Sequence, residues 1–177
     1  MLRFSSLAGA LSAVTLMAST AFAQIPADPN NPNEALPEKA TFLPYGETIK
    51  LDQAMKAAEA ALAESAKRGW PMCIAVVSPS GDLVYFIKMD DCQFASIAIS
   101  QHKAKAAATF RRPTLAFERL LGRGSFFSYL TTLDGVIASR GGNPIVVNGK
   151  IIGAIGVSGG TGSQDEVISQ AGVAVVK

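Results

Sequence analysis

The stretch from Val146 to Glu166, VVNGKIIGAIGVSGGTGSQDE, constrains the fold more than any other part of the chain. Its two apolar runs flank Asn148-Gly149, a pair that favours the tight turn of a β-hairpin. The second run ends in the glycine-dense SGGTGS, which a polar helix start follows. The sequence therefore predicts a hairpin of residues 144–147 and 151–157 that turns sharply into a helix.

The glycine-dense turn raises the question of a phosphate site. It lacks the lysine of a G-x-x-x-x-G-K-[ST] loop and the setting of a G-x-G-x-x-G fingerprint. Ser163 and Glu166 instead match an S-x-x-E capping box, which would occupy the amides at the helix start. Asp165 adds a further negative charge there. We interpret the glycines as serving a tight turn or a close approach of another backbone.

Composition indicates one globular domain. The 177 residues are 49% hydrophobic and 17% charged, which suits a single sizeable core. The 16 basic and 14 acidic residues are mixed along the chain and give a net charge of +2. Because no basic face for DNA or RNA is indicated, nucleic acids are excluded as the main partner.

Residues 1–23 have the pattern of a secretory signal peptide. A basic start at Arg3 precedes an apolar stretch over residues 7–17, and Ala21 and Ala23 fit an A-x-A cleavage site. The apolar stretch is too short to span a membrane, and no basic cluster follows it to suggest the alternative, a retained anchor. We therefore expect a periplasmic or secreted protein without a membrane span in its mature form.

The rest of the chain divides into an arm and a domain. Residues 24–46 are rich in proline and asparagine and predict an extended arm, and residues 47–177 form the domain. Its fold class is predicted to be α+β, with about five antiparallel strands and packed helices. Before the C-terminal hairpin we expect a helix over residues 52–68 capped by Asp52, a hairpin over 72–89, helices over 94–110 and 114–121, and a long loop over 122–141 that contains a short strand or helix.

The two cysteines, Cys73 and Cys92, are predicted to form a disulfide. An oxidising compartment favours this bond over free thiols. Cys73 begins the first hairpin strand and Cys92 lies just past the end of its partner, so the hairpin brings them close. With no C-x-x-C and one histidine, the chain lacks the signatures of zinc and of covalently attached haem.

Three stretches, GGNPIVVNGKIIGAIGVSGGTGSQDEVISQAG, AVVSPSGDLVYFIKMDD and KAKAAATFRRPT, resemble the GlcG/HbpS family of haem-binding and haem-degrading-like proteins, which includes the C-terminal domain of PduO-type proteins. The resemblance runs from about Leu51 to Val176. It implies a profilin-like domain, homo-oligomers up to octamers, and binding of haem or a corrinoid-related role. Relatives use histidine or threonine as iron ligand. The histidine that some carry near the start of the first helix is absent here, as is the E-x-x-E motif of iron-binding relatives.

The stretch ATFRRPT supplies the candidate contacts to a tetrapyrrole. Arg111 and Arg112 could pair with two propionates, Phe110 offers a flat apolar face, and Thr109 and Thr114 carry hydroxyls. The alternative interpretation is a helix C-terminus whose arginines complement the helix dipole. The two interpretations differ in whether the arginines contact a ligand.

His102, the only histidine, is the candidate iron ligand. Its lysine neighbours also fit a solvated surface residue. Tyr85 and Tyr129 are further candidate ligands, although aromatic side chains in strands and loops commonly serve packing. Asp90 and Asp91 lack the third oxygen group that a calcium site needs.

The predicted function is that of an exported haem (tetrapyrrole)-binding homo-oligomer in haem handling or redox sensing. The alternative is an enzyme or accessory factor that acts on a small organic molecule in a subunit-interface pocket. No G-x-S-x-G motif and no recognisable Ser/His/Asp arrangement appears, so catalytic residues stay unassigned.

Overall fold

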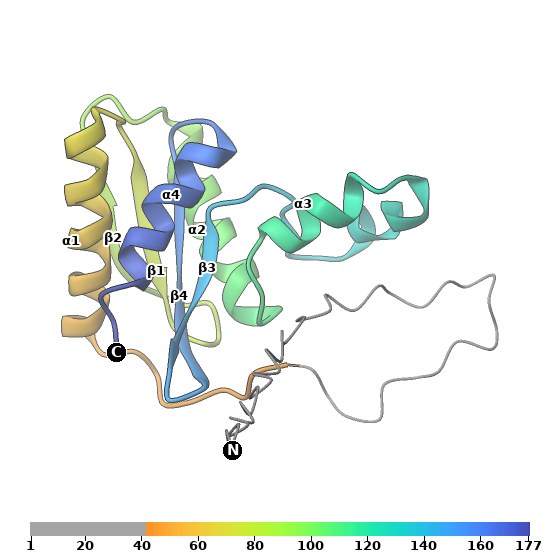
Figure 1. Cartoon of the computed structure of the whole chain (residues 1–177), viewed down its shortest axis with the longest axis horizontal. Coiled ribbons are helices and arrows are strands. Elements are labelled where there is room, and N and C mark those ends of the chain that lie inside the picture. Colours follow the sequence, from red (N-terminus) through yellow and green to blue (C-terminus); the bar gives the residue numbers. More distant parts are fainter. Residues whose placement is uncertain (1–41) are drawn as a thin grey trace, which may run out of the picture. The chain divides into compact units, whose positions relative to one another are not determined.

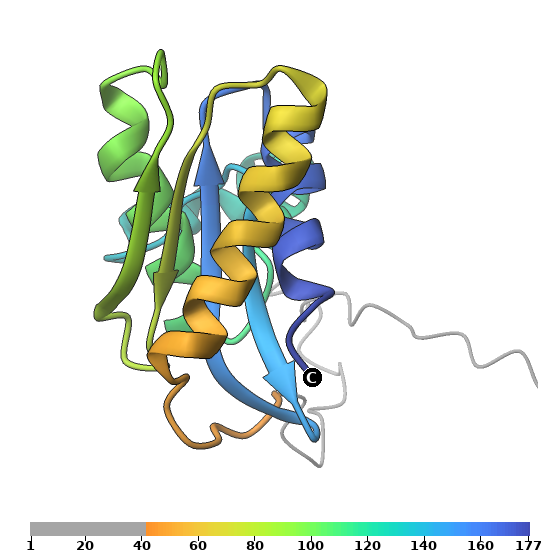
Figure 2. The same ribbon diagram turned by 90° about the vertical axis from the view of Figure 1, so that its left-hand side faces the viewer.

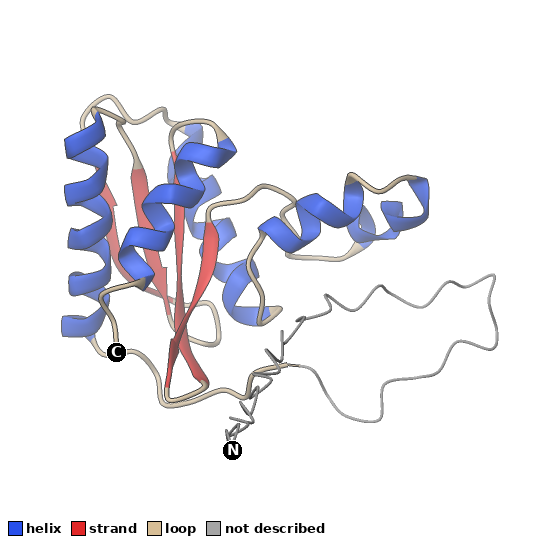
Figure 3. Ribbon diagram, in the orientation of Figure 1, coloured by secondary structure: helices blue, strands red, loops and turns tan. Residues whose placement is uncertain are grey.

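The computed structural model describes residues 42–177, so the expected signal peptide and most of the arm lie outside the described residues. This part of the chain forms an antiparallel sheet with helices on both faces (Figures 1 and 3), which confirms the α+β class. In chain order the elements are α1 (Leu51–Arg68), β1 (Cys73–Val77), β2 (Leu83–Lys88), α2 (Ala95–Thr109), α3 (Leu115–Leu121), the 3-10 helix η1 (Ser125–Thr132), β3 (Gly142–Val147), β4 (Lys150–Ser158) and α4 (Gly162–Val173).

The sheet has four strands in the order β2-β1-β4-β3, so the expectation of about five was wrong. Residues 42–50, before α1, run beside the start of β4 and form an isolated bridge there between Tyr45 and Ile151. Ile151 donates its N–H to Pro44 O at 2.9 Å, and Gly46 donates to Ile151 O at 2.8 Å. Ile49 also donates to Ile152 O at 2.7 Å, but this segment does not form a continuous ladder with β4.

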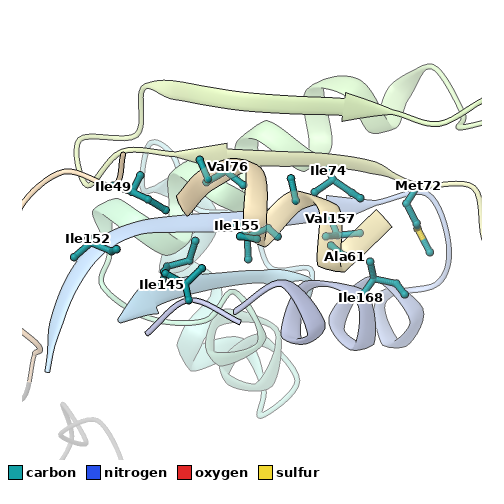
Figure 4. Packing of buried hydrophobic residues seen from close by; sticks show 14 residues of the cluster. Ile49, Ala61, Met72, Ile74, Val76, Ile145, Ile152, Ile155, Val157 and Ile168 are labelled. Atoms are coloured by element: carbon teal, nitrogen blue, oxygen red, sulfur yellow. The ribbon is translucent and has the colours of Figure 1, made fainter. Parts of the chain in front are cut away.

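The main core lies between the sheet and the paired helices α1 and α4, and α2 covers the opposite face (Figures 1 and 2). Figure 4 shows the aliphatic side chains that fill the core, such as Ile74, Val76 and Ile155. Each of these three is fully buried. Burial of one such side chain contributes about 1.5–3 kcal/mol.

Glycine residues of β4 let neighbouring backbone approach the strand closely. A Cβ atom at Gly156 would overlap Ser100 O and Ala104 N of α2, and one at Gly153 would overlap Val77 O of β1. Small residues accordingly line both sides of this contact, such as Ala75 and Ala154 on the sheet and Ala104 on α2. Helix α2 can therefore lie almost directly on β4.

The C-terminal hairpin has the predicted turn. Asn148 and Gly149 have φ values of 50° and 72°, the left-handed conformations of a type I′ turn. Asparagine and glycine tolerate this conformation better than other residues, so the pair fixes the register in which β3 and β4 begin to pair.

Both predicted helix caps need correction. Helix α4 is capped two residues earlier than expected: Thr161 Oγ1 accepts from Gln164 N at 3.4 Å, and Thr161 N donates to Gln164 Oε1 at 2.8 Å. The capping box is therefore T-x-x-Q, and Ser163 lies inside the helix. In α1 the cap is Lys50, whose N–H donates to Gln53 Oε1 at 3.2 Å, and Asp52 lies in the first turn.

The Cys73–Cys92 disulfide is present and joins the start of β1 to the turn before α2, with 6.0 Å between the Cα atoms. Both cysteines are buried. Beyond α2, α3 and η1 project from the sheet (Figure 3) and share a small core of Phe117, Phe127 and Leu130. Across residues 42–177 no helix is long and apolar enough to cross a membrane.

Candidate functional site

The end of α2 places two arginines side by side. The N–H groups of Arg111 and Arg112 close the helix by donating to Ala108 O at 3.3 Å and Ala107 O at 3.2 Å. Arg111 has a φ of 55°, a left-handed conformation that few non-glycine residues adopt. Pro113 follows and prevents the helix from continuing. The chain therefore turns sharply at the arginines.

Tyr45, a residue of the expected arm, supports this corner. Tyr45 donates its hydroxyl to Ala108 O and Thr109 O, each at 3.1 Å, which satisfies carbonyls at the end of α2. The Arg111 guanidinium carbon lies 4.3 Å from the centroid of the Tyr45 ring. The sequence alone did not identify Tyr45 as part of the site, because the arm shows no periodicity that assigns it a neighbour.

Arg112 lies between aromatic rings. Its guanidinium carbon is 5.1 Å from the Phe42 centroid and 5.7 Å from the Phe117 centroid. Its Nε donates to Phe110 O at 3.1 Å, and the half-buried Phe110 ring meets the Phe117 ring edge to face at 5.3 Å. Cation–π contacts of this kind hold a guanidinium flat while its in-plane N–H groups stay available.

Neither arginine forms an ion pair with a carboxylate among residues 42–177. A planar guanidinium can bind a carboxylate through two parallel N–H···O bonds. Arg111 is exposed and Arg112 is half-buried. The corner therefore offers two adjacent guanidinium groups beside aromatic faces, which suits a flat ligand with two carboxylates.

The candidate iron ligands lie along the exposed side of α2 that leads to this corner. His102 and Thr109 are both exposed. Because they are seven residues apart, they lie on the same side of the helix, about 10 Å apart along its axis. The Thr109 hydroxyl donates to Lys105 O at 2.8 Å, which leaves lone pairs of its oxygen unused.

Thr114 does not belong to this surface. Its side chain is fully buried, its Oγ1 accepts from Gly142 N at 3.0 Å, and its own N–H donates to Gly142 O at 2.9 Å. The threonine thus fastens the start of α3 to β3, and its burial corrects the expectation that its hydroxyl faces a ligand. The structure therefore assigns Thr114 to the fold.

The remaining sequence candidates do not meet this corner. Tyr85 lies half-buried on β2, and Tyr129 is exposed on η1. Asp90 and Asp91 are exposed in the turn after β2. Among the described residues no three metal-binding side chains of histidine, cysteine, aspartate or glutamate gather in one place.

A buried ion pair that sequence reasoning missed ties α2 to α4. Lys103 Nζ lies 2.6 Å from Asp165 Oδ2, and both side chains are almost fully buried. Asp165 Oδ1 also accepts from Gly160 N at 3.1 Å. The pKa of Asp165 is raised overall, because the effect of burial exceeds the opposite effects of the Lys103 ammonium and the backbone donors. Because both side chains are buried, the pair joins α2 to the start of α4 within the fold.

A second pair lies where α3 meets the start of β3. Arg140 donates to both carboxylate oxygens of Glu118, and these hydrogen bonds lower the Glu118 pKa below its ordinary value. Glu166, expected in a capping box, instead accepts from Gly141 N at 2.8 Å and Asn143 Nδ2 at 3.2 Å. These contacts position the chain around Gly141 and leave Glu166 without a capping role.

A groove of about 500 Å³ opens between the start of α1 and the β3–β4 hairpin. Its charged lining consists of Glu47, Lys50, Asp52 and Lys150, and no histidine or cysteine lines it. The mixed charges suit a small polar molecule.

Comparison with known proteins assigns the chain to a family. The family described as haem degrading protein HbpS-like matches residues 49–174. The chain belongs to this family. Protein GlcG of Escherichia coli (strain K12) is 40% identical to this HbpS-like chain over 95 residues, which cover 54% of the chain and 69% of GlcG. The matched family range includes Arg111 and Arg112 at the end of α2, which we call the arginine corner. Phe42 and Tyr45, whose rings contact these arginines, precede the matched range.

Two solved structures share the HbpS-like fold. A double mutant of Streptomyces reticuli HbpS is 28% identical, with a TM-score of 0.69 over 81% of this chain and 99% of that one. PduOC, solved as a heme complex, is 22% identical, with a TM-score of 0.66 over 72% of this chain and 94% of that one. The identity to PduOC is low enough that this likeness shows the fold alone.

Proposed function

We propose that the protein is an exported haem-binding protein that holds the tetrapyrrole at the C-terminal end of α2. Membership of the family described as haem degrading protein HbpS-like supports a haem-related role. The observation that carries the location is the arginine corner, where Arg111 and Arg112 lie on aromatic rings without a carboxylate partner in residues 42–177.

The residues present fit a haem in kind. Arg111 and Arg112 would pair with the propionates, and the rings of Phe42 and Phe110 would offer apolar contacts beside them. His102 or Thr109 would hold the iron, since both are exposed on the same side of α2. A bound haem supplies redox-active iron, whose potential the axial ligand tunes.

Export is supported by the signal-like start of the chain and by the Cys73–Cys92 disulfide, a bond typical of oxidising compartments. A role in haem handling or redox sensing follows from a haem site in such a compartment. We also propose a homo-oligomer.

Titration of the mature protein with haemin tests the proposal. The wild type is expected to give a saturable shift of the Soret band, and Arg111→Ala/Arg112→Ala is expected to weaken binding at least about tenfold, because charge-assisted hydrogen bonds contribute about 1.5–3 kcal/mol each. Arg119→Ala/Arg123→Ala removes two exposed arginines of the neighbouring segment and is the matched control. Equal affinities in both double variants would contradict the location.

The axial ligand is tested separately. His102→Ala is expected to change the Soret and charge-transfer bands while the melting temperature stays the same, because His102 is exposed and packs no core. If its spectrum is unchanged and Thr109→Val alters it, Thr109 is the ligand. Unchanged spectra in both variants would exclude both residues.

A small-molecule role is the second candidate, and the groove beside the start of α1 favours it. Lys50→Ala/Lys150→Ala changes this groove and leaves the arginine corner intact. If Lys50→Ala/Lys150→Ala weakens haemin binding and Arg111→Ala/Arg112→Ala does not, the haem site lies in the groove.

A further inference from the structure

Tyr45 contacts two parts of the arginine corner with two parts of its side chain. Its hydroxyl donates to Ala108 O and Thr109 O, the carbonyls of the last two residues of α2, each at 3.1 Å. Its ring lies against the guanidinium of Arg111, whose central carbon is 4.3 Å from the ring centroid. One side chain therefore joins the end of the helix to Arg111, the residue whose φ of 55° turns the chain away from that helix.

The backbone around Tyr45 is held by β4. Pro44 O accepts from Ile151 N at 2.9 Å, and Gly46 N donates to Ile151 O at 2.8 Å, so these hydrogen bonds flank Tyr45 on both sides. Ile151 itself is fully buried in the fold. The sheet therefore fixes where the backbone of Tyr45 lies, without any contribution from Arg111.

The two arginines of the corner are held in different ways. Arg112 lies between the rings of Phe42 and Phe117, and its Nε donates to a backbone carbonyl at 3.1 Å. Arg111 is exposed and forms no ion pair within residues 42–177, and its guanidinium lies against the ring of Tyr45. An exposed arginine has much rotamer freedom to lose when it binds a ligand. The ring restricts this freedom in advance through a cation–π contact.

We propose that Tyr45 is a positioning residue: its ring holds the Arg111 guanidinium beside Arg112, which makes the corner selective for tetrapyrroles with two free carboxylates. A group that is ordered before binding loses less entropy on binding, and an oriented guanidinium can donate two parallel N–H···O bonds to a carboxylate. The inference rests on the proposed haem site and names the feature of the ligand that this site selects. Tyr45 precedes residues 49–174, so the contact lies outside the range that matches the family.

Titrations with haemin and with haemin dimethyl ester test this inference. Esterification removes both carboxylate charges and leaves the iron and the macrocycle unchanged. The wild type is expected to bind haemin at least about tenfold more tightly than the ester, because only haemin forms charge-assisted hydrogen bonds with the arginines. Tyr45→Leu is expected to weaken haemin binding about fivefold and to leave ester binding within about twofold of the wild type, because Arg111 loses the ring that orients it.

Two further variants separate the ring from the hydroxyl and from tyrosine loss in general. Tyr45→Phe removes the hydroxyl and keeps the ring against Arg111, so it is expected to retain the haemin affinity of the wild type. Tyr129→Leu is the matched control, because it makes the same change at an exposed tyrosine of η1. It is expected to bind both ligands as the wild type does.

Equal weakening of haemin and ester binding by Tyr45→Leu would show that Tyr45 only supports the fold of the corner, and would overturn the inference. Unchanged haemin binding in Tyr45→Leu would overturn it too, as would a loss in Tyr45→Phe or Tyr129→Leu as large as that in Tyr45→Leu. In these cases Arg111→Ala/Arg112→Ala still decides independently whether haemin binds at the corner. A wild type that does not bind haemin overturns the proposed function and this inference together.

Discussion

The site at the end of α2 depends on the backbone conformation of one residue. Arg111 holds a φ of 55°, which glycine adopts without strain and other residues at a cost of about 1–2 kcal/mol. This conformation turns the chain so that Arg111 stacks on Tyr45 and Arg112 on Phe42. The corner therefore keeps a mildly strained residue where a ligand contact is proposed, as functional sites often do.

Arg111→Gly separates stability from binding. The glycine relieves the backbone strain and loses a cation–π contact of about 0.5–1 kcal/mol, so the free energy of unfolding is expected to change little. Haemin affinity is expected to fall, because the guanidinium is gone. Urea unfolding and a haemin titration measure the two effects. A loss of more than about 2 kcal/mol of stability would mean that Arg111 serves the fold.

The Lys103–Asp165 pair predicts strong coupling in unfolding experiments. Lys103→Met leaves the buried Asp165 carboxylate without its partner and is expected to lower the free energy of unfolding by about 3–5 kcal/mol. Adding Asp165→Asn removes the stranded charge and keeps an acceptor for Gly160 N–H, so the double variant is expected to be more stable than the single one. Additive losses in urea unfolding would show that the two residues act independently.

The Glu118–Arg140 pair predicts a pH dependence. Arg140 lowers the folded-state pKa of Glu118 below its unfolded value, so the ionised pair stabilises the fold above the unfolded pKa of about 4.3 and loses this effect as pH falls through the folded pKa. Both side chains are about a third exposed, so the contribution is about 1 kcal/mol or less. Glu118→Gln is expected to lower the melting temperature near neutral pH, by a margin that shrinks toward about pH 3. A margin that is constant across this pH range would contradict the assignment.

At the residue scale, the sequence indicated the side chains that lie close together along one helix end. Arg111, Arg112 and Phe110 adjoin in the chain, and the end of α2 places them at one corner. Tyr45 and Asp165 were not assigned, because their partners on α2 are 62–64 residues away and only the fold brings them together. Thr114 was misplaced, because its neighbourhood in the chain does not reveal that Gly142 covers it.

At the element scale, helix and strand positions followed the spacing of apolar residues, with glycine and proline at the ends. The glycine-dense stretch SGGTGS serves close packing and a tight turn. The strand count and the caps were less accurate, since they depend on where neighbouring strands stop pairing. Both S-x-x-E and T-x-x-Q fit a capping box at the start of α4. In the structure β4 ends at Ser158 and Thr161 is the cap residue.

Gly156 tests the packing of α2 on β4. Gly156→Ala introduces a methyl group where Ser100 O and Ala104 N already lie, and is expected to cost at least about 2 kcal/mol of stability. Gly122→Ala is the control, because a Cβ there meets Glu118 O at an ordinary 3.5 Å, and it is expected to be neutral or slightly stabilising. Chemical denaturation compares the two. Similar small effects would mean that α2 can move away from the strand.

At the scale of the whole molecule, two surfaces remain available for interaction outside the closed core. The arginine corner lies at one end of α2 and suits a planar dicarboxylate ligand. The second surface is the edge of β2, which pairs only with β1 among the described residues.

Hydrogen–deuterium exchange with and without haemin locates the ligand most directly. The account predicts slower exchange in the peptides that contain Phe42 to Gly46 and Ala106 to Arg112, which meet at the arginine corner. Slower exchange confined to the start of α1 and the β3–β4 turn, or no change anywhere, would contradict a haem site at the end of α2.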